Sequence, residues 1–384
     1  MDDLVARTQR LLESFDADVR AELPEGADIF DAHVHLGHDI DGMVGDFDEL
    51  VGIQERYGIS GAFTFCLDEP DRRPAFTAAN DRTLAFAERS AGRFVPFVRL
   101  DLAERPIEEA ERCLDAGARG IKLHPRAQKF LLNDERLAPV FELAAERRVP
   151  ILIHGGRGLP PIADSLAHLV ERYDGAQLII AHCGIADLAG LASRFCGRPG
   201  VYFDTSVWSP LDVLDLFRLV APEQVLYASD YPYAQQPASL LLALRCARLS
   251  GLDDGQLRAM LAGSARRIAS GQEPLPLSPP CGLEEISQPL TFARIHAYLS
   301  MATPLLWTRQ SDTIGVLGLA LNACDERSNG HREQTERIRE LLVAARDLWR
   351  TFPELEDETD RVRTARLAFR LLHLANITAV TSAA

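Results

Sequence analysis

The sequence has 384 residues, of which 47% are apolar and 25% charged, the balance of a globular protein with a large buried core. Its formal net charge of −15 opposes the attraction to phosphates on which nucleic-acid binders depend. The apolar runs are all shorter than the roughly 18 uncharged residues that a membrane span needs. We therefore expect a small-molecule partner, with no binding to nucleic acid or membrane.

The N-terminal segment, residues 1–26, is charged and amphipathic, which predicts a helix. It lacks the apolar centre of a secretory signal, so we expect a cytoplasmic protein. The seven cysteines form no CxxC pair, so neither a disulfide framework nor a thiolate zinc site is predicted.

From residue 27 to residue 272, short apolar runs alternate with longer amphipathic ones, the pattern of repeated βα units with a parallel sheet. The predicted strands are 27–37, 59–68, 93–101, 118–125, 149–156, 176–184, 200–206 and 224–232. The predicted helices between them are 47–57, 78–91, 106–116, 134–148, 162–173, 185–195, 209–220 and 236–249. Eight such units favour an α/β fold of the closed (β/α)8 TIM-barrel type over an open doubly wound sheet.

The chain after the predicted barrel changes character. The Pro-rich stretch 273–283 cannot continue a helix and reads as a linker. Residues 284–384 then show helical patterns without an alternating strand signal, which predicts an all-helical C-terminal extension. Three roles for the extension are compatible with the sequence: a contact in a homo-oligomer, a lid over the pocket or a docking surface for a partner.

Polar residues end five of the predicted strands, at the end of a TIM barrel where active sites lie. Residues i and i+2 of a strand share a face, so His33 and His35 can point at one centre. Imidazoles and carboxylates suit Zn²⁺, and three or four of them plus a water give an open catalytic site. Taken singly, His154 and His182 could be core histidines, and Asp230 a helix cap. The full set is His33, His35, Lys122, His124, His154, His182 and Asp230.

Five segments together resemble the amidohydrolase superfamily, most closely the amidohydrolase-related branch that includes aminocarboxymuconate-semialdehyde decarboxylase. They are DAHVHLG at 31–37, GIKLHP at 120–125, LIHGG at 152–156, IIAHCG at 179–184 and YASDYP at 227–232. The resemblance runs from about residue 28 to residue 270. It implies a metal-dependent TIM-barrel catalytic domain within residues 27–272. The branch usually has Asn at the position of Ser264. This difference would affect packing or helix capping more than the chemistry of the site.

The resemblance also implies roles for the polar residues. His33, His35, His154 and Asp230 would bind a metal, expected to be Zn²⁺. Asp230 would accept the proton of the attacking water, and His182 would polarise the substrate oxygen or protonate the leaving group. His182 could instead bind a second metal.

The role of Lys122 determines whether the site is expected to hold one metal or two. In binuclear members of the superfamily a lysine on strand four is carboxylated and bridges two metals, and Lys122 occupies a comparable place. The alternative is an ordinary cation. Only Lys122 and Lys129 among the 41 basic residues are lysines, which hints that position 122 needs an amine able to lose its proton.

Further residues near the strand ends are predicted to bind substrate. Arg99 ends strand three, Arg126 follows strand four and Arg157 follows strand five. Guanidinium groups suit a carboxylate-bearing substrate. Solvated surface arginines are the common alternative. Aromatic residues at 208, 231 and 233 could form a wall of the pocket or fill the core. The candidate substrate contacts are Arg99, His124, Arg126, Arg157 and Trp208.

Together these features predict a mononuclear zinc hydrolase, in which a metal-activated water cleaves a C–N or C–O bond in a small organic acid, amide or lactone. The first alternative is a zinc-dependent, non-oxidative decarboxylase of a carboxylate, because the related branch uses the same kind of site for that reaction. The second is a catalytically inactive, metal-binding barrel whose tail mediates interactions.

Overall fold

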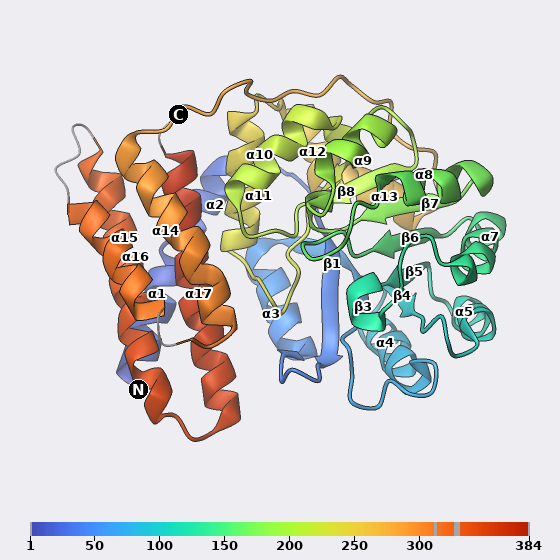
Figure 1. The fold of residues 1–384 in the computed structure, drawn as a ribbon, viewed down its shortest axis with the longest axis horizontal. Helices are drawn as coiled ribbons and strands as arrows, with labels where there is room; N and C mark the ends of the chain where they lie inside the picture. The colour runs from blue at the N-terminus through green and yellow to red at the C-terminus, as the bar shows by residue number, and fades with distance from the viewer. Residues whose placement is uncertain (1, 311–312, 326–330, 383–384) are drawn as a thin grey trace.

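The computed structural model describes residues 2–310, 313–325 and 331–382 as an α/β barrel beside a bundle of helices (Figure 1). The N-terminal segment forms two helices, α1 (Asp2–Glu13) and α2 (Asp16–Glu22), where the sequence predicted one. They connect the two parts of the molecule, because Asp18 accepts hydrogen bonds from Arg245 of the barrel at 2.6 Å and from Arg337 of the bundle at 2.8 Å.

Nine strands form one sheet in the order β2-β1-β3-β4-β5-β6-β7-β8-β9. All neighbours run parallel except β2, which is antiparallel to β1 and was not predicted. The eight predicted strands are all present, most of them shorter than the apolar runs that predicted them. The bounds are β1 (Ile29–His38), β2 (Val44–Gly45), β3 (Ile59–Cys66), β4 (Phe94–Arg99), β5 (Gly120–Leu123), β6 (Pro150–Ile153), β7 (Gln177–Ile180), β8 (Val201–Asp204) and β9 (Val225–Leu226).

Residues 227–231, which follow β9, close the barrel against β1. The amide of Asp230 donates to the carbonyl of His33 at 3.0 Å, and the amide of His35 donates to the carbonyl of Tyr231 at 2.7 Å. The predicted TIM barrel is thereby confirmed. The same bonds place Asp230 beside both histidines of β1.

Helices cover the outside of the barrel because each has one apolar face. In α5, for example, Ala110, Cys113 and Leu114 are buried at helical spacing. The barrel helices are α3 (Phe47–Tyr57), α4 (Thr77–Arg89), α5 (Pro106–Asp115), α6 (Pro125–Gln128), α7 (Ala138–Arg147), α8 (Ala163–Arg172), α9 (Leu188–Phe195), α10 (Pro210–Leu219), α11 (Ala238–Leu249), α12 (Asp254–Arg258) and α13 (Ser264–Ala269). Single turns are η1 (Glu135–Leu137), η2 (His182–Gly184), η3 (Pro222–Gln224) and the π-helical η4 (Ala259–Gly263).

The C-terminal extension is all-helical, as predicted. Its helices are α14 (Leu290–Trp307), α15 (Thr313–Asp325), α16 (Arg332–Thr351), the turn η5 (Phe352–Glu354) and α17 (Glu358–Thr381). Helix α17 packs against α10 and α11, so the bundle lies along one side of the barrel (Figure 1). The chain between α13 and α14 crosses from barrel to bundle without a helix or strand. Within the described ranges, every helix is too short or too polar to cross a bilayer.

The barrel interior is filled with apolar side chains, and this packing predicts a large difference between two leucine substitutions. Leu152 on β6 is fully buried, whereas Leu131 in a surface loop is 55% exposed. We expect Leu152→Ala to lower the free energy of unfolding by about 2–5 kcal/mol, because it leaves a cavity. Leu131→Ala is the control, with an expected change within about 0.5 kcal/mol. Urea unfolding followed by circular dichroism measures both, and equal effects would contradict the packing described.

Candidate metal centre

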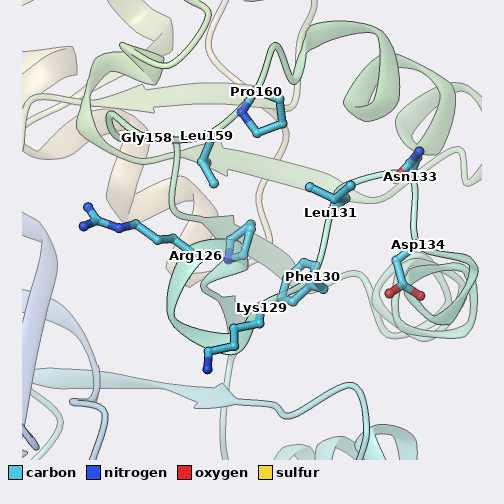
Figure 2. A pocket seen from close by; sticks show the side chains of 10 residues that line it. Arg126, Lys129, Phe130, Leu131, Asn133, Asp134, Gly158, Leu159 and Pro160 are labelled. Atoms are coloured by element: carbon cyan, nitrogen blue, oxygen red, sulfur yellow. The ribbon is translucent and has the colours of Figure 1, made fainter.

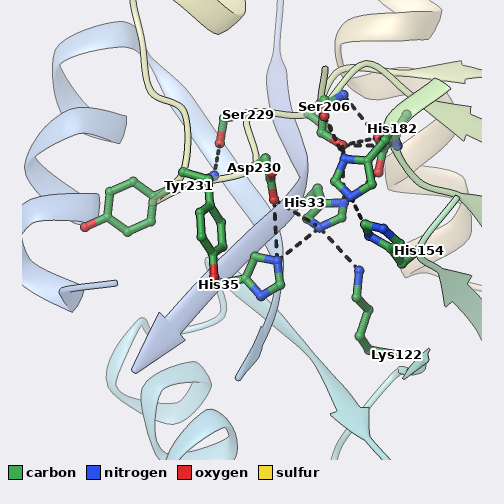
Figure 3. Close-up of polar contacts among 12 residues, drawn as sticks. His33, His35, Lys122, His154, His182, Ser206, Ser229, Asp230 and Tyr231 are labelled. Atoms are coloured by element: carbon green, nitrogen blue, oxygen red, sulfur yellow. Dashed lines mark hydrogen bonds and ion pairs between the residues drawn. The ribbon is translucent and has the colours of Figure 1, made fainter. Parts of the chain in front are cut away.

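Three buried side chains converge at the open end of the barrel (Figure 3). The Nε2 atoms of His33 and His35 are 3.2 Å apart, and Oδ1 of Asp230 lies 3.4 and 3.5 Å from them. Four-coordinate zinc with ligand bonds of about 2.0–2.1 Å places its ligand atoms roughly 3.3 Å apart. The triangle of ligand atoms therefore has the dimensions of three corners of a tetrahedral metal site.

The protonation of the two imidazoles also fits a bound cation. His33 Nδ1 lies 2.7 Å from Oδ2 of Asp204, and His35 Nδ1 lies 3.4 Å from the carbonyl oxygen of Cys66. A proton on each Nδ1 leaves the lone pairs of both Nε2 atoms facing each other and the Asp230 carboxylate. Lys122 Nζ lies 3.3 Å from one of these acceptors, and a cation among the three would stabilise all of them.

Burial keeps both imidazoles neutral. It lowers the pKa of His33 to about 3, helped by the charge of Lys122 and opposed by Asp204. The pKa of His35 also lies well below its ordinary value, because of burial and because a protonated His35 would be repelled by a protonated His33 and by Lys122. Neutral imidazole is the form that binds metal, so both residues are ready to do so at neutral pH.

Asp204, at the end of β8, is a buried carboxylate that contacts His33 of the ligand triangle. The sequence analysis did not predict it. Burial alone raises its pKa, but the charge and hydrogen bond of His33, together with His182 and Ser206, hold the pKa well below its ordinary value. Oδ1 of Asp204 also accepts hydrogen bonds from the amide of His182 at 2.8 Å and from the Ser206 hydroxyl. The signal was available in the sequence, because Asp204 ends the apolar run Val201–Phe203 in the same way as the other site residues end theirs.

A second group of imidazoles lies beside the triangle. His182 Nε2 is 2.9 Å from His154 Nδ1, and His182 Nδ1 is 2.7 Å from the carbonyl oxygen of Ser206. His124 stacks on His154 with ring centroids 3.9 Å apart. His154 Nε2 is buried and has no hydrogen-bond partner among the described residues. The structure thus pairs His154 with His182, and metal binding by His154 remains a prediction.

Two site residues have strained backbones. Asp230 and His182 have φ values of 63° and 58°, in the left-handed region that residues other than glycine rarely adopt. The bond from the Asp230 amide to His33 and the bond from the His182 amide to Asp204 hold these conformations. Such strain is typical of sites where a side chain must point in one direction.

Lys122 lies inside the barrel, with Nζ 3.3 Å from His33 Nε2 and 4.5 Å from the centre of the Phe65 ring. Burial lowers the pKa of Lys122 to about 7, against the opposing charges of Asp204 and Asp230. Its amine therefore exchanges between the charged and neutral forms near neutral pH. Burial also raises the pKa of Asp230 well above its ordinary value, although the charge of Lys122 counters it.

The predicted substrate arginines lie in three different environments. Arg99 is buried, with guanidinium nitrogens 3.4 Å from the Cys66 carbonyl and 3.7 Å from Asp68. Arg157 is 73% exposed and pairs with Asp212 at 3.1 Å. Arg126 is exposed and borders an open pocket of about 460 Å³, shown in Figure 2. This pocket contains none of the candidate metal ligands and is lined by Pro125, Arg126, Lys129, Phe130, Leu131, Asn133, Asp134, Gly158, Leu159 and Pro160.

Of the predicted aromatic residues, Tyr233 faces the centre. Its ring lies edge-on to His35 with centroids 5.8 Å apart, and its hydroxyl donates to Asp39 at 3.1 Å. Trp208 instead stacks on Trp307 of the extension at 5.5 Å. Tyr231 is buried and donates to a carboxylate of α3.

A TIM barrel with a buried His-His-Asp group at its open end has the architecture of a metal-dependent enzyme. The family model described as Amidohydrolase matches residues 30–268. The chain therefore belongs to the amidohydrolase family and is an enzyme of the hydrolase type, which confirms the family resemblance and argues against an inactive barrel. The narrower resemblance to the decarboxylase-containing branch remains a prediction.

Solved structures share this fold at low sequence identity. A TIM-barrel protein from Bordetella bronchiseptica has a TM-score of 0.51 at 16% identity, covering 64% of this chain and 100% of that one. A probable 2-pyrone-4,6-dicarboxylic acid hydrolase from Acinetobacter baumannii was solved with citric acid bound. It has a TM-score of 0.50 at 12% identity, and the match covers 63% of this chain and 99% of that one. A search of curated proteins finds no significant match. The helical extension lies beyond the family match.

The contact between Asp204 and His33 predicts a loss of metal affinity in Asp204→Asn. The amide keeps the size of the side chain but removes the charge that orients the imidazole, so we expect zinc affinity to fall about 10- to 100-fold. Competition with a chromogenic chelator measures this. Asp164→Asn is the control, because its carboxylate is 84% exposed. Equal zinc affinity in both variants would contradict the role of Asp204.

Proposed function

We propose that the protein is a mononuclear zinc hydrolase that uses a metal-activated water to cleave a C–N or C–O bond in a small organic acid, amide or lactone. The triangle of His33, His35 and Asp230, with edges of 3.2–3.5 Å, carries this proposal. Two imidazoles and a carboxylate are typical ligands of catalytic zinc. A bound zinc ion supplies a water whose pKa falls from about 15.7 towards about 7.

Asp230 is the proposed proton acceptor. Its carboxylate lies at the ligand triangle, and burial raises its pKa well above the ordinary value. A carboxylate at the ligand triangle would lie next to the metal-activated water, within reach of the proton that this water loses, which suits a general base. Its fixed left-handed backbone limits where the carboxylate can point.

His182 is proposed to pass a proton to the leaving group, after Nε2 has taken up a proton that the attacking water releases. With Nδ1 held at the Ser206 carbonyl, its Nε2 faces the interior and contacts His154 at 2.9 Å. This imidazole pair provides a route by which a proton can reach or leave the substrate. In the alternative with two metals, Lys122 and His182 would bind the second ion, with Lys122 carboxylated.

A carboxylate-bearing substrate is proposed because two buried cations face the centre. The charges of Lys122 and Arg99 both act on His35, and Arg99 Nε has no hydrogen-bond partner among the described residues. A substrate carboxylate would give the Arg99 Nε–H an acceptor and would lie close to the Lys122 amine. His124, which directly follows β5, is the proposed neighbouring contact, while Arg126, Arg157 and Trp208 would act farther out.

The proposed reaction predicts different consequences for two histidines. We expect His182→Gln to retain zinc but to lose about 10²- to 10⁴-fold in kcat, because it removes a proton-transfer group. His168→Gln is the matched control, since His168 is exposed on α8, and it should change neither quantity. The assay is a panel of lactones, amides and aromatic carboxylates, followed by product analysis and by CO₂ release.

Hydrolysis of a panel member that depends on zinc supports the proposal. Release of CO₂ without hydrolysis would overturn it and favour the decarboxylase. A His182→Gln variant with unchanged kcat would exclude the proton-transfer role, whatever the substrate.

A further inference from the structure

The helices of the extension, α14 to α17, differ in what covers their outer sides. Helix α17 packs against α10 and α11 of the barrel, and α16 packs against α1. Helix α15 packs against α14 and α16, and it lies on the side of the bundle away from the barrel (Figure 1). The outer sides of α14 and α15 thus carry exposed residues along both helices.

The exposed residues of α14 and α15 form a face without charged side chains, which we call the uncharged face. Met301 of α14 is 56% exposed, and Leu319 of α15 is 45% exposed. Because α15 runs back along α14 and both residues are equally far from the turn between the helices, they lie at the same level. The uncharged face consists of Ala297, Ser300, Met301 and Pro304 on α14 and of Gly315, Leu319 and Asn322 on α15.

Helix α16 shows how a solvent-facing helix of this bundle is ordinarily composed. Its exposed residues are all charged, namely Arg332, Glu333, Glu336, Arg339, Glu340 and Arg350. In contrast, residues 297–307 and 313–324 contain no Asp, Glu, Lys, Arg or His. A helix that is apolar on all sides is normally buried on all sides. The uncharged face therefore has the composition of a contact surface.

Two glycines in α15 leave room for a close neighbour. A Cβ atom built on Gly315 or Gly318 would meet nothing within 4 Å among the described residues. Glycine makes a helix less stable than alanine does, and no contact within the described part of the chain requires it at either position. A second helix that crosses α15 here could approach its backbone closely, because no Cβ atom stands in the way.

The charge of the chain favours a second copy as the occupant of this face. At a net charge of −15, two copies repel each other, and they do so least where uncharged surfaces meet. A partner attracted by charge would need charged residues on the face, which has none. The interfaces of homodimers are also more apolar than those of transient complexes.

The size of the uncharged face is close to what a stable dimer buries. Helix α14 has 18 residues, so it is roughly 27 Å long at about 1.5 Å per residue. Two helices whose axes lie about 8–10 Å apart form a face about 20 Å wide. This outline of roughly 500 Å² approaches the ~600 Å² per partner at the lower end of stable interfaces, and the relief of the side chains adds to it.

We propose that the uncharged face is the interface of a homodimer, in which α14 and α15 of one copy pack on α14 and α15 of the other about a twofold axis. Such a contact uses the same residues on both sides, so Met301 and Leu319 of each copy are buried together. The two helix pairs then form one bundle between the two barrels. The dimer does not depend on the metal centre, and it gives the extension the role of an assembly contact.

The mass of the full chain in solution, measured by sedimentation equilibrium from nanomolar to high-micromolar concentration, tests the dimer. We expect a reversible change from one chain to two. Met301→Glu and Leu319→Glu each bring like charges into the interface, so we expect either one to weaken dimerisation about 10-fold or more. Glutamate is a good helix former and both positions are exposed, so both variants should fold.

Leu131→Glu is the matched control for these variants. It makes the same change of charge at a leucine that is 55% exposed in a loop of the barrel, so the dimer should form as in the natural chain. Hydrogen exchange then locates the interface independently. We expect the amides of α14 and α15 to exchange more slowly at high than at low protein concentration, and those of α16 to exchange equally at both.

A chain that stays monomeric over the whole range of concentration overturns the proposal. Co-sedimentation of that monomer with phosphatidylcholine vesicles would assign the face to a membrane surface instead. A dimer that Met301→Glu and Leu319→Glu leave intact, or that Leu131→Glu weakens as much as they do, would also overturn the proposal. So would concentration-dependent protection that is confined to another surface.

Discussion

The hydrogen bonds by which residues 227–231 close the barrel on β1 set the geometry of the whole site. They fix the register that brings Asp230 to the two histidines of β1, and a slip of one residue would turn its side chain away. Asp31 holds both segments, because its Oδ1 accepts from the amides of Ser229 at 2.9 Å and His33 at 3.3 Å. The left-handed backbone of Asp230, which costs roughly 1–2 kcal/mol, persists because closure of the barrel requires it.

The electrostatics of the site follow from this enclosure. Exclusion of water keeps the two imidazoles neutral and lowers the pKa of the Lys122 amine to about 7, whereas the contacts with His33, His182 and Ser206 keep Asp204 charged. Each group is suited to hold a cation or to move a proton. The extension adds to the enclosure from outside the barrel, because Trp307 and Tyr233 cover the side of the centre where His35 lies.

The sequence predicted the barrel and the residues that the structure groups in the candidate metal centre, because both depend on local patterns. Apolar runs mark the strands, and polar residues that end them mark the edge where the site lies. Asp204 was missed because a single aspartate at the end of a strand resembles an ordinary helix cap. The pairing of His154 with His182 depends on ring orientation, which spacing along the chain does not determine. The stacking of Trp208 on Trp307 depends on how the extension docks, and helical periodicity does not indicate which partner a face will meet.

X-ray absorption at the zinc edge, together with metal analysis of the zinc-loaded protein, tests the central claim most directly. The triangle formed by His33, His35 and Asp230 predicts one zinc ion per chain, with nitrogen and oxygen ligands at about 2.0–2.2 Å and at least two of them imidazoles, three if His154 also binds. His35→Ala should abolish this signal. A first shell that contains sulfur at about 2.3 Å, or an unchanged spectrum in His35→Ala, would contradict the proposed centre.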